Sequence, residues 1–352
     1  MPLGLAPEVE CAAAQKTVVA LGRGNLANPT RKLLALLYGC RNWLLKQQWF
    51  TSRLLPALPR SLRWTLRKLY FLPSDLIERV LNDRDELVPP RSSIFTGSVD
   101  DFRGSGEALV RRLADAGCLT PESKVLDIGS GMGRVAVALI SYRGGRGSYQ
   151  GLDIVPSGIK WCSQNITSRY PNYTFTLADI FNKEYNPAGR LKASEYRFPF
   201  DDQTFDLAVL GSVFTHMLPE DMRHYIAEVA RVLKRGGTCC ASYNLLDAES
   251  LRAMKAGRGA FRFTRLGPHW VVDVNVPELA VAYEEDYVRK LFEEYGLSCT
   301  IHHGWWSGRT DTSREPPWFL DQDDPEFRYF DQDYVLATKV DVGRRDEIAP
   351  RR

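Results

Sequence analysis

Residues 125–134 read VLDIGSGMGR, and this stretch decides the fold. A short apolar run ends at Asp127 and is followed by glycine at three alternating positions, Gly129, Gly131 and Gly133. Such a run predicts a buried strand that ends in a tight turn. Glycine in that turn permits a positive φ and removes Cβ atoms that would collide with a bound molecule. The stretch therefore predicts a ligand site where a strand of an α/β sheet ends.

Strands and helices are predicted to alternate on both sides of this stretch. The prediction follows from apolar residues that recur at helical spacing in some segments and form short continuous runs in others. Alternation of this kind is typical of a parallel sheet with helices on both faces. Helices are predicted over residues 105–116, 134–142, 157–170, 219–233 and 284–295, and strands over residues 124–128, 148–154, 173–178, 205–210, 237–243, 298–303 and 334–339.

The chain is predicted to divide near a Val-Pro-Pro linker, because two successive prolines remove backbone donors and hold the chain extended. Two later segments are too long for plain connections and are predicted to act as lids. The linker is residues 88–90. It separates a basic helical extension (1–90) from a catalytic domain (91–340), which a polar tail (341–352) follows. The predicted lids are residues 245–282 and 305–331.

The N-terminal region is basic, although the net charge of the whole chain is only +3. Residues 11–74 contain eleven Lys and Arg residues and no Asp or Glu, so the remainder of the chain has a net charge of −8. Apolar residues recur at helical spacing over residues 31–50 and again over 61–71. Two interpretations stay open. Residues 31–71 lie on an anionic membrane surface, or their apolar faces dock on the acidic domain as a cap or as the interface of a homodimer.

No apolar run reaches the roughly 20 residues that span a bilayer. The N-terminus lacks the charged region and apolar core of a secretory signal. We therefore expect a cytoplasmic protein, either free or attached to a membrane surface. The seven cysteines are odd in number and form no C-x-x-C pair, which disfavours a disulfide framework or a zinc cluster. No metal site is predicted.

Two cofactors compete for the glycine turn. Gly131, Gly133 and Ala136 satisfy the G-x-G-x-x-A spacing of a dinucleotide-binding turn. Asp127 decides against a dinucleotide, because a carboxylate at the strand end would repel a pyrophosphate but would suit a cationic amino-acid moiety. S-adenosylmethionine supplies that cation through its ammonium and sulfonium groups. Asp153, twenty residues after Gly133, is placed to accept hydrogen bonds from the ribose of either cofactor.

The order and spacing of five motifs resemble those of class I S-adenosylmethionine-dependent methyltransferases, in particular the bacterial group that methylates small molecules. The resemblance implies a Rossmann-like, doubly wound α/β sheet of seven strands with the last one antiparallel. Arg235 stands where this family commonly has proline, a departure that bears on the turn alone. The motifs are VLDIGSGMGR at 125–134, GLDIV at 151–155, LADI at 177–180, FDLAVLGSVFTHM at 205–217 and RVLKRGG at 231–237.

The same resemblance implies which residues bind each part of the cofactor. The methionine end would be lined by the glycine turn and its acidic residue, and the ribose and adenine by residues that end the next two strands. The implied residues are Asp127, Gly129, Gly131 and Gly133 for the methionine end, Asp153 and Ile154 for the ribose, Asp179 and Ile180 for the adenine, and Ser212 for the loop beneath the methionine.

Methyl transfer to oxygen or nitrogen needs a nearby base. His216 follows the fourth strand, and its imidazole titrates in the useful pH range. His302 or His303 could serve instead, although adjacent strand residues face opposite ways, so at most one of them faces the site. Tyr243 and Trp306 are weighed as substrate contacts, against the commoner packing role of aromatic residues.

The predicted function is thus S-adenosylmethionine-dependent methyl transfer, at oxygen, to a small or lipid-linked molecule. Nucleic acid is disfavoured as a substrate, because the loop at residues 211–214 reads Gly-Ser-Val-Phe and lacks the Asn/Asp-Pro-Pro-Tyr of enzymes that methylate base amino groups. Two alternatives remain: an NAD(P)-dependent oxidoreductase, and a non-catalytic module that binds S-adenosylmethionine to regulate a partner.

Overall fold

The computed structural model describes Leu58 and residues 60–80, 85–96, 102–183, 185–259, 261–309 and 332–340. The chain divides into two compact units, Met1–Ala108 and Leu109–Arg352. The predicted helix over residues 31–50, most of the predicted lid over 305–331 and the tail at 341–352 lie outside the described residues. Among the helices that are described, none has the length and apolar character needed to cross a membrane.

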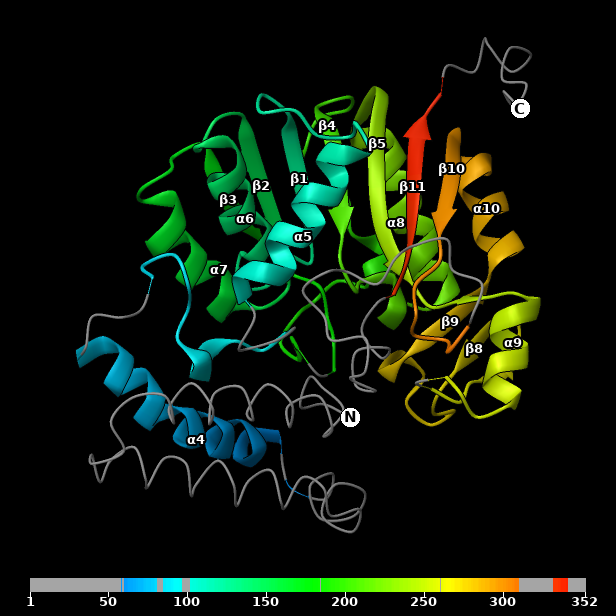
Figure 1. The fold of residues 1–352 in the computed structure, drawn as a ribbon, viewed down its shortest axis with the longest axis horizontal. Coiled ribbons are helices and arrows are strands. Elements are labelled where there is room, and N and C mark those ends of the chain that lie inside the picture. Colours follow the sequence, from blue (N-terminus) through cyan, green and yellow to red (C-terminus); the bar gives the residue numbers. More distant parts are fainter. Residues whose placement is uncertain are drawn as a thin grey trace. The chain divides into compact units, whose positions relative to one another are not determined.

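A seven-stranded sheet forms the centre of the larger unit (Figure 1). Its strands are β1 (Lys124–Ile128), β2 (Ser148–Asp153), β3 (Tyr173–Leu177), β4 (Phe205–Leu210), β5 (Leu233–Tyr243), β10 (Leu297–His302) and β11 (Asp333–Lys339). They lie in the order β10-β11-β5-β4-β1-β2-β3. β11 is antiparallel to β5 and β10, and the other neighbours are parallel. The predicted doubly wound sheet with an antiparallel last strand is confirmed.

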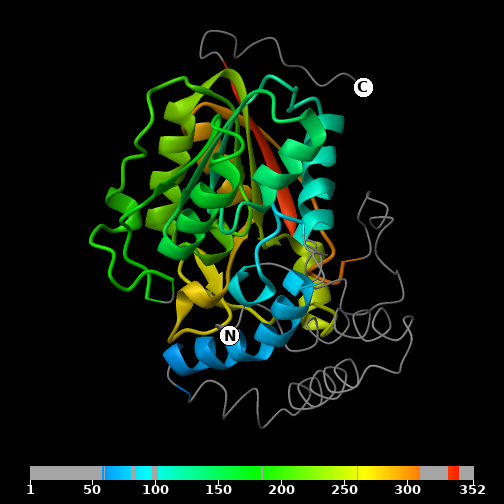
Figure 2. The ribbon, with the colours of Figure 1, turned by 90° about the vertical axis from the view of Figure 1, so that its left-hand side faces the viewer.

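Helices lie on both sides of this sheet, as the view in Figure 2 shows. Helices α8 (Pro219–Val232) and α10 (Glu285–Glu294) contribute Ile226, Val229 and Leu291 to the main apolar core, together with residues of β1, β4 and β5. Further helices beside the sheet are α5 (Phe102–Asp115), α6 (Arg134–Arg143) and α7 (Pro156–Cys162), and α7 continues as a π-helical turn at Ser163–Thr167.

Strand β5 begins four residues earlier than predicted, at Leu233. The pairing of β4 with β5 is irregular there, because the step from Phe205 to Leu207 matches the longer step from Leu233 to Thr238. Gly236, with φ +74°, lies in this bulge. A bulge inserts unpaired residues into a strand, and it is set by pairing with a distant partner. The local sequence has the pattern of a glycine turn, and the predicted start of β5 was therefore too late.

The segment predicted to be a lid at residues 245–282 folds as a small sheet with one helix. The strands β6 (Leu245–Leu246), β7 (Thr264–Leu266), β8 (His269–Val271) and β9 (Val281–Glu284) lie in the order β6-β9-β8-β7, and α9 (Ala248–Lys255) follows β6. This insertion lies beyond the carboxyl ends of β5 and β10 in Figure 1. It has its own apolar cluster, in which Phe263 packs edge-on against the buried Trp306. Trp306 is thus a packing residue.

The smaller unit contains α4 (Arg60–Val80), which is longer than the predicted helix over 61–71 and passes through Pro73. A proline inside a helix removes one backbone hydrogen bond and costs about 3 kcal/mol. Tertiary contacts offset that loss beyond Pro73: Asp75 accepts hydrogen bonds from the backbone of Arg91 (2.7 Å) and Ser92 (3.1 Å), and Glu78 pairs with Arg91 Nε at 2.8 Å.

Arg143, at the end of α6, ties the amino ends of β1, β2 and β3 together and leads to a stability prediction. Its buried guanidinium donates to the hydroxyl of Tyr173 (2.7 Å) and to the carbonyl oxygens of Ser123 (2.8 Å) and Ser148 (3.1 Å). We expect Arg143→Leu to lower the free energy of unfolding by about 2–4 kcal/mol, because it leaves buried acceptors without donors. Urea unfolding followed by circular dichroism measures this loss.

The matched control is Arg146→Leu. Arg146 is 63% exposed and pairs with Glu122 at 3.3 Å, and exposed pairs of this kind contribute at most about 1 kcal/mol. Equal stability of the two variants would contradict the role given to Arg143.

Candidate active site

The turn after β1 has the conformation that its glycines predict. Gly129, Gly131 and Gly133 have φ values of +78°, +55° and +79°. A Cβ atom on Gly129 would lie 2.6 Å from Val213 Cγ2, and one on Gly133 would lie 2.7 Å from Ile166 Cδ1. The positive φ therefore favours glycine at both positions, and the close approach of Val213 also disfavours a Cβ atom on Gly129.

Asp153, at the end of β2, holds this turn in place. Its carboxylate is 7% exposed and accepts hydrogen bonds from the backbone N–H of Gly131 (2.7 Å) and of Val155 (2.8 Å). The backbone N–H of Gly129 donates to the carbonyl oxygen of Leu152 at 2.7 Å. The turn after β1 is thus fixed to the end of β2. The backbone of Ile154 also hydrogen-bonds to this carboxylate, so three of its four lone pairs are used and one remains for another donor.

Asp127, at the entrance of the turn, is only 2% exposed, and the hydroxyl of Tyr149 donates to its Oδ2 at 2.6 Å. Burial raises the pKa of Asp127 to about 7; the Tyr149 hydrogen bond opposes this rise, and the nearby Asp153 carboxylate adds to it. Sequence reasoning missed Tyr149. Its position in β2 puts it on the same face as Asp153, but nothing in the sequence shows that its hydroxyl reaches across to Asp127.

Asp179 and Ile180 lie just after β3, and each is held by contacts with neighbouring residues. Asp179 Oδ2 pairs with Arg190 Nε at 2.5 Å. Ile180 is 3% exposed and belongs to the main core; its N–H donates to the carbonyl oxygen of Ala178 (2.9 Å), and its own carbonyl accepts from Asn186 Nδ2 (2.9 Å). Ile154, after β2, packs against the same core. Packing of Ile154 and Ile180 in the core, together with the hydrogen bonds of the loop after β3, thus positions the ends of β2 and β3.

Ser212, in the loop after β4, has a strained backbone. Its φ of +56° lies in the left-handed region, which non-glycine residues rarely adopt. Hydrogen bonds on both sides hold it there, from its N–H to Ser242 Oγ (2.7 Å) and from its Oγ to Gln332 Oε1 (3.0 Å). Strain of this kind is concentrated at functional sites. The next residue, Val213, is the one whose side chain packs against Gly129.

His216 ends a 3-10 turn (Phe214–His216) after β4, and its ring contacts the insertion. Its Nδ1 lies 3.0 Å from the carbonyl oxygen of Glu278. A carbonyl oxygen only accepts, so Nδ1 carries the proton, and in the neutral ring Nε2 carries the lone pair. This is the tautomer that a general base at Nε2 requires. Tyr243, by contrast, is fully buried and stacks on Phe214, which makes it a core residue.

Comparison with known proteins gives both a family and a relative. Residues 119–296 match a family model described as a methyltransferase domain. Over 90 residues the chain is 34% identical to the phthiotriol/phenolphthiotriol dimycocerosates methyltransferase of Mycobacterium leprae. The aligned stretch covers 26% of this chain and 26% of that protein, so the chain matches about a quarter of the length of this curated relative.

Two solved structures are also similar. One is a candidate sarcosine dimethylglycine methyltransferase from Galdieria sulphuraria, with 19% identity, a TM-score of 0.43 and coverage of 68% of this chain and 86% of that one. The other is the 1,6-didemethyltoxoflavin-N1-methyltransferase of Burkholderia thailandensis with bound 1,6-didemethyltoxoflavin and S-adenosylhomocysteine, with 17% identity, a TM-score of 0.39 and coverage of 81% and 92%.

The strand order, the antiparallel β11 and the glycine turn after β1 define the fold class of class I S-adenosylmethionine-dependent methyltransferases. The family model extends over half of the chain, from just before β1 to the end of α10. The chain belongs to the methyltransferase domain family, and its cofactor is S-adenosylmethionine.

The raised pKa of Asp127 predicts how stability without cofactor changes with pH. Its pKa of about 7 in the folded chain lies above the ordinary value of 3.8, so ionisation opposes folding. The stability contributed by the protonated carboxyl is complete below about pH 4 and is lost as the pH rises through 7. We expect Asp127→Asn, which cannot ionise, to become more stable relative to the wild type by up to about 1.4 kcal/mol per pH unit between pH 4 and 7.

Urea unfolding at pH 5, 6, 7 and 8, without cofactor, measures this difference. Asp201→Asn, at an exposed position, is the control and should follow the wild type throughout. A constant difference between Asp127→Asn and the wild type across this range would contradict the prediction.

Proposed function

We propose that the protein transfers the methyl group of S-adenosylmethionine to an oxygen atom of a small or lipid-linked molecule, with His216 as the general base. The observation that carries this proposal is the contact between His216 Nδ1 and the Glu278 carbonyl oxygen at 3.0 Å. It selects the tautomer with an acceptor nitrogen at Nε2. His216 also follows β4, on the carboxyl edge of the sheet, where ligands of such sheets bind.

In this proposal the cofactor lies over the turn after β1. Buried Asp127 favours a cationic ligand, because a nearby ammonium or sulfonium group stabilises the ionised carboxylate. The remaining lone pair of Asp153 suits a ribose hydroxyl, and the strained Ser212 adjoins the turn through Val213. The proposed cofactor residues are Asp127, Gly129, Gly131, Gly133, Asp153, Ile154, Asp179, Ile180 and Ser212.

The proposed reaction is an in-line displacement. The acceptor oxygen forms a bond to the methyl carbon while the bond from that carbon to sulfur breaks, and S-adenosylhomocysteine leaves as a neutral thioether. The proton of the acceptor hydroxyl passes to Nε2 of His216. The carbonyl of Glu278 keeps its hydrogen bond to Nδ1 and stabilises the imidazolium that forms. Holding the two reactants in line supplies most of the remaining rate enhancement.

A lipid-linked acceptor is supported by the Mycobacterium leprae relative, whose name gives dimycocerosate esters of triols as the molecules that it methylates. Helix α4 gives a second line of support for lipid. Its sequence contains five basic residues and two acidic ones, a composition that favours an anionic lipid surface. We therefore propose that the basic extension, residues 1–90, brings the protein to a membrane surface.

The two faces of α4 differ in a way that fits this proposal. One face carries Asp75 and Glu78, which bind the backbone and side chain of Arg91, and Arg67, whose guanidinium donates to the carbonyl oxygen of Ile94 at 2.7 Å. The other face carries leucines at spacings of three and four residues, each between 42% and 58% exposed. Amphipathic helices insert such a stripe into the boundary of a bilayer. The leucines are Leu62, Leu66, Leu69, Leu72 and Leu76.

The methyl-transfer proposal predicts the effect of His216→Ala. With methyl-tritiated S-adenosylmethionine and an extract of the cells that produce the protein, we expect label in the organic phase and a mass increase of 14 Da in one product. His216→Ala should lower the rate by about 100-fold or more, because proton removal by a positioned base contributes this much. Calorimetry with S-adenosylhomocysteine should give unchanged affinity.

His224→Ala is the control, since His224 also contacts a backbone carbonyl, that of Tyr196, but from α8. Full activity of His216→Ala on the identified acceptor would remove the base from the proposal. If the label stayed in the aqueous phase, the proposal of a lipid-linked acceptor would be excluded.

The membrane proposal predicts that the intact protein floats with vesicles of phosphatidylcholine containing phosphatidylglycerol. It should not float with phosphatidylcholine alone, and high salt should release it. Replacing Leu66, Leu69 and Leu76 together by serine should weaken binding about tenfold or more, because apolar burial is lost. The exposed Leu177 and Leu191, replaced by serine, give the control. Equal flotation of the α4 variant and the wild type would exclude α4 as the binding surface.

A further inference from the structure

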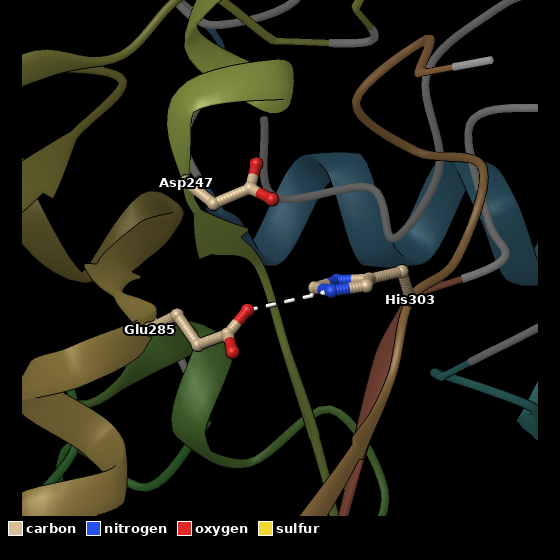
Figure 3. A group of neighbouring side chains, drawn as sticks. All are labelled: Asp247, Glu285 and His303. Carbon is tan, nitrogen blue, oxygen red and sulfur yellow. Dashed lines mark ion pairs between the residues drawn. The ribbon is translucent and has the colours of Figure 1, made fainter. Parts of the chain in front are cut away.

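Three side chains from separate segments converge beyond the carboxyl ends of β5 and β10 (Figure 3). Asp247 precedes α9, Glu285 is the first residue of α10, and His303 follows β10. One carboxylate oxygen of each acid and one ring nitrogen of His303 all lie within 4.8 Å of one another. The three side chains are 29%, 18% and 26% exposed, so the cluster is partly shielded from solvent.

The imidazole of His303 lies between two carboxylates. Its Nε2 is 3.4 Å from Glu285 Oε2, and its Nδ1 is 3.7 Å from Asp333 Oδ1. Both distances exceed the 2.7–3.2 Å usual for N–H···O hydrogen bonds. An imidazole whose N–H is at Nδ1 offers the lone pair of Nε2 as a metal ligand, on the side of Glu285. A cation between Nε2 and Oε2 would be bound by both atoms.

The distance between these two atoms suits a metal ion. Around a tetrahedral zinc ion with bonds of about 2.0–2.1 Å, two ligand atoms lie about 3.3–3.4 Å apart. The separation of His303 Nε2 and Glu285 Oε2 is 3.4 Å. The carboxylate of Asp247 lies near both of these groups, as Figure 3 shows, and is a third candidate ligand. The cluster thus offers three candidate ligand atoms, two carboxylate oxygens and one imidazole nitrogen, whereas a shared proton would join only two atoms.

The surroundings of the cluster resemble the outer shell of metal sites. Metal-binding histidines usually direct their second nitrogen toward a carboxylate, and metal-binding carboxylates are themselves hydrogen-bonded. Asp333, 1% exposed, lies behind Nδ1 of His303. Arg289 binds the other oxygen of Glu285 at 2.7 Å, and Arg309, 3% exposed, binds Asp247 Oδ2 at 2.8 Å. These contacts hold the candidate ligands in position before any ion binds.

We propose that Asp247, Glu285 and His303 bind one divalent cation, with Zn²⁺ the best fit to a set of one nitrogen and two oxygen ligands. Three protein ligands leave a fourth position for water or for an oxygen of the acceptor. The proposal goes beyond the proposed function, because proton removal by His216 does not require it. It also departs from the expectation, drawn from cysteine spacing, that the chain has no metal site.

The test measures metal binding directly in the full chain, produced without a histidine tag and treated with chelator. Calorimetric titration with ZnCl₂ should give one ion per chain, and Co²⁺ should give the visible absorption of a tetrahedral site. We expect His303→Ala and Glu285→Gln each to weaken Zn²⁺ binding at least tenfold and to abolish the Co²⁺ spectrum. Glu285→Gln keeps the shape of the side chain and so tests the site if His303→Ala folds poorly.

His302→Ala is the matched control, because His302 is the adjacent residue but does not belong to the cluster; this variant should bind Zn²⁺ like the wild type. Circular dichroism and S-adenosylhomocysteine affinity verify that each variant folds, and they also separate this test from that of the proposed function. Absence of stoichiometric binding by the wild type, or wild-type binding by both His303→Ala and Glu285→Gln, would overturn the proposal.

Discussion

The hydrogen bond from the backbone N–H of Gly131 to the buried carboxylate of Asp153 is the constraint on which the site depends. Neighbouring parallel strands bring their carboxyl ends to one edge, but this alone does not fix a flexible glycine turn. Asp153 fixes it by joining the turn after β1 to the end of β2. The second acid, Asp127, then lies buried beside the first, and this proximity is one reason why its pKa is raised. The fold thus concentrates negative charge where a cationic cofactor would compensate for it.

Much of the fold follows from the sequence, because the central strands are continuous apolar runs with clear ends. β1 and β4 were predicted to the residue, since β1 ends in a glycine turn and β4 is a short apolar run ending at Gly211. The start of β5 was wrong because its bulge depends on pairing with β4, which the local sequence does not encode. The end of α4 was wrong for a similar reason: contacts from Arg91 and Ser92 carry the helix past Pro73.

The candidate site was predictable to a lesser extent. The glycine turn and its acids lie within one short stretch and the next strand, and their spacing carries the information. Tyr149 was missed, because only the folded sheet brings its hydroxyl to Asp127. The cluster of Asp247, Glu285 and His303 was missed for a stronger reason. Its members come from three segments with no regular spacing, and His303 was considered only as a base.

The insertion at residues 245–282 contacts the proposed base and contributes to the proposed metal site. Glu278 orients the ring of His216, and Asp247 belongs to the cluster with Glu285 and His303. The turn after β1, by contrast, is hydrogen-bonded to the end of β2. In the proposed function, the cofactor binds mainly at the turn after β1, and the insertion contributes on the acceptor side. Exchange of this insertion between related enzymes would alter acceptor choice and proton transfer together, while the methyl donor stayed the same.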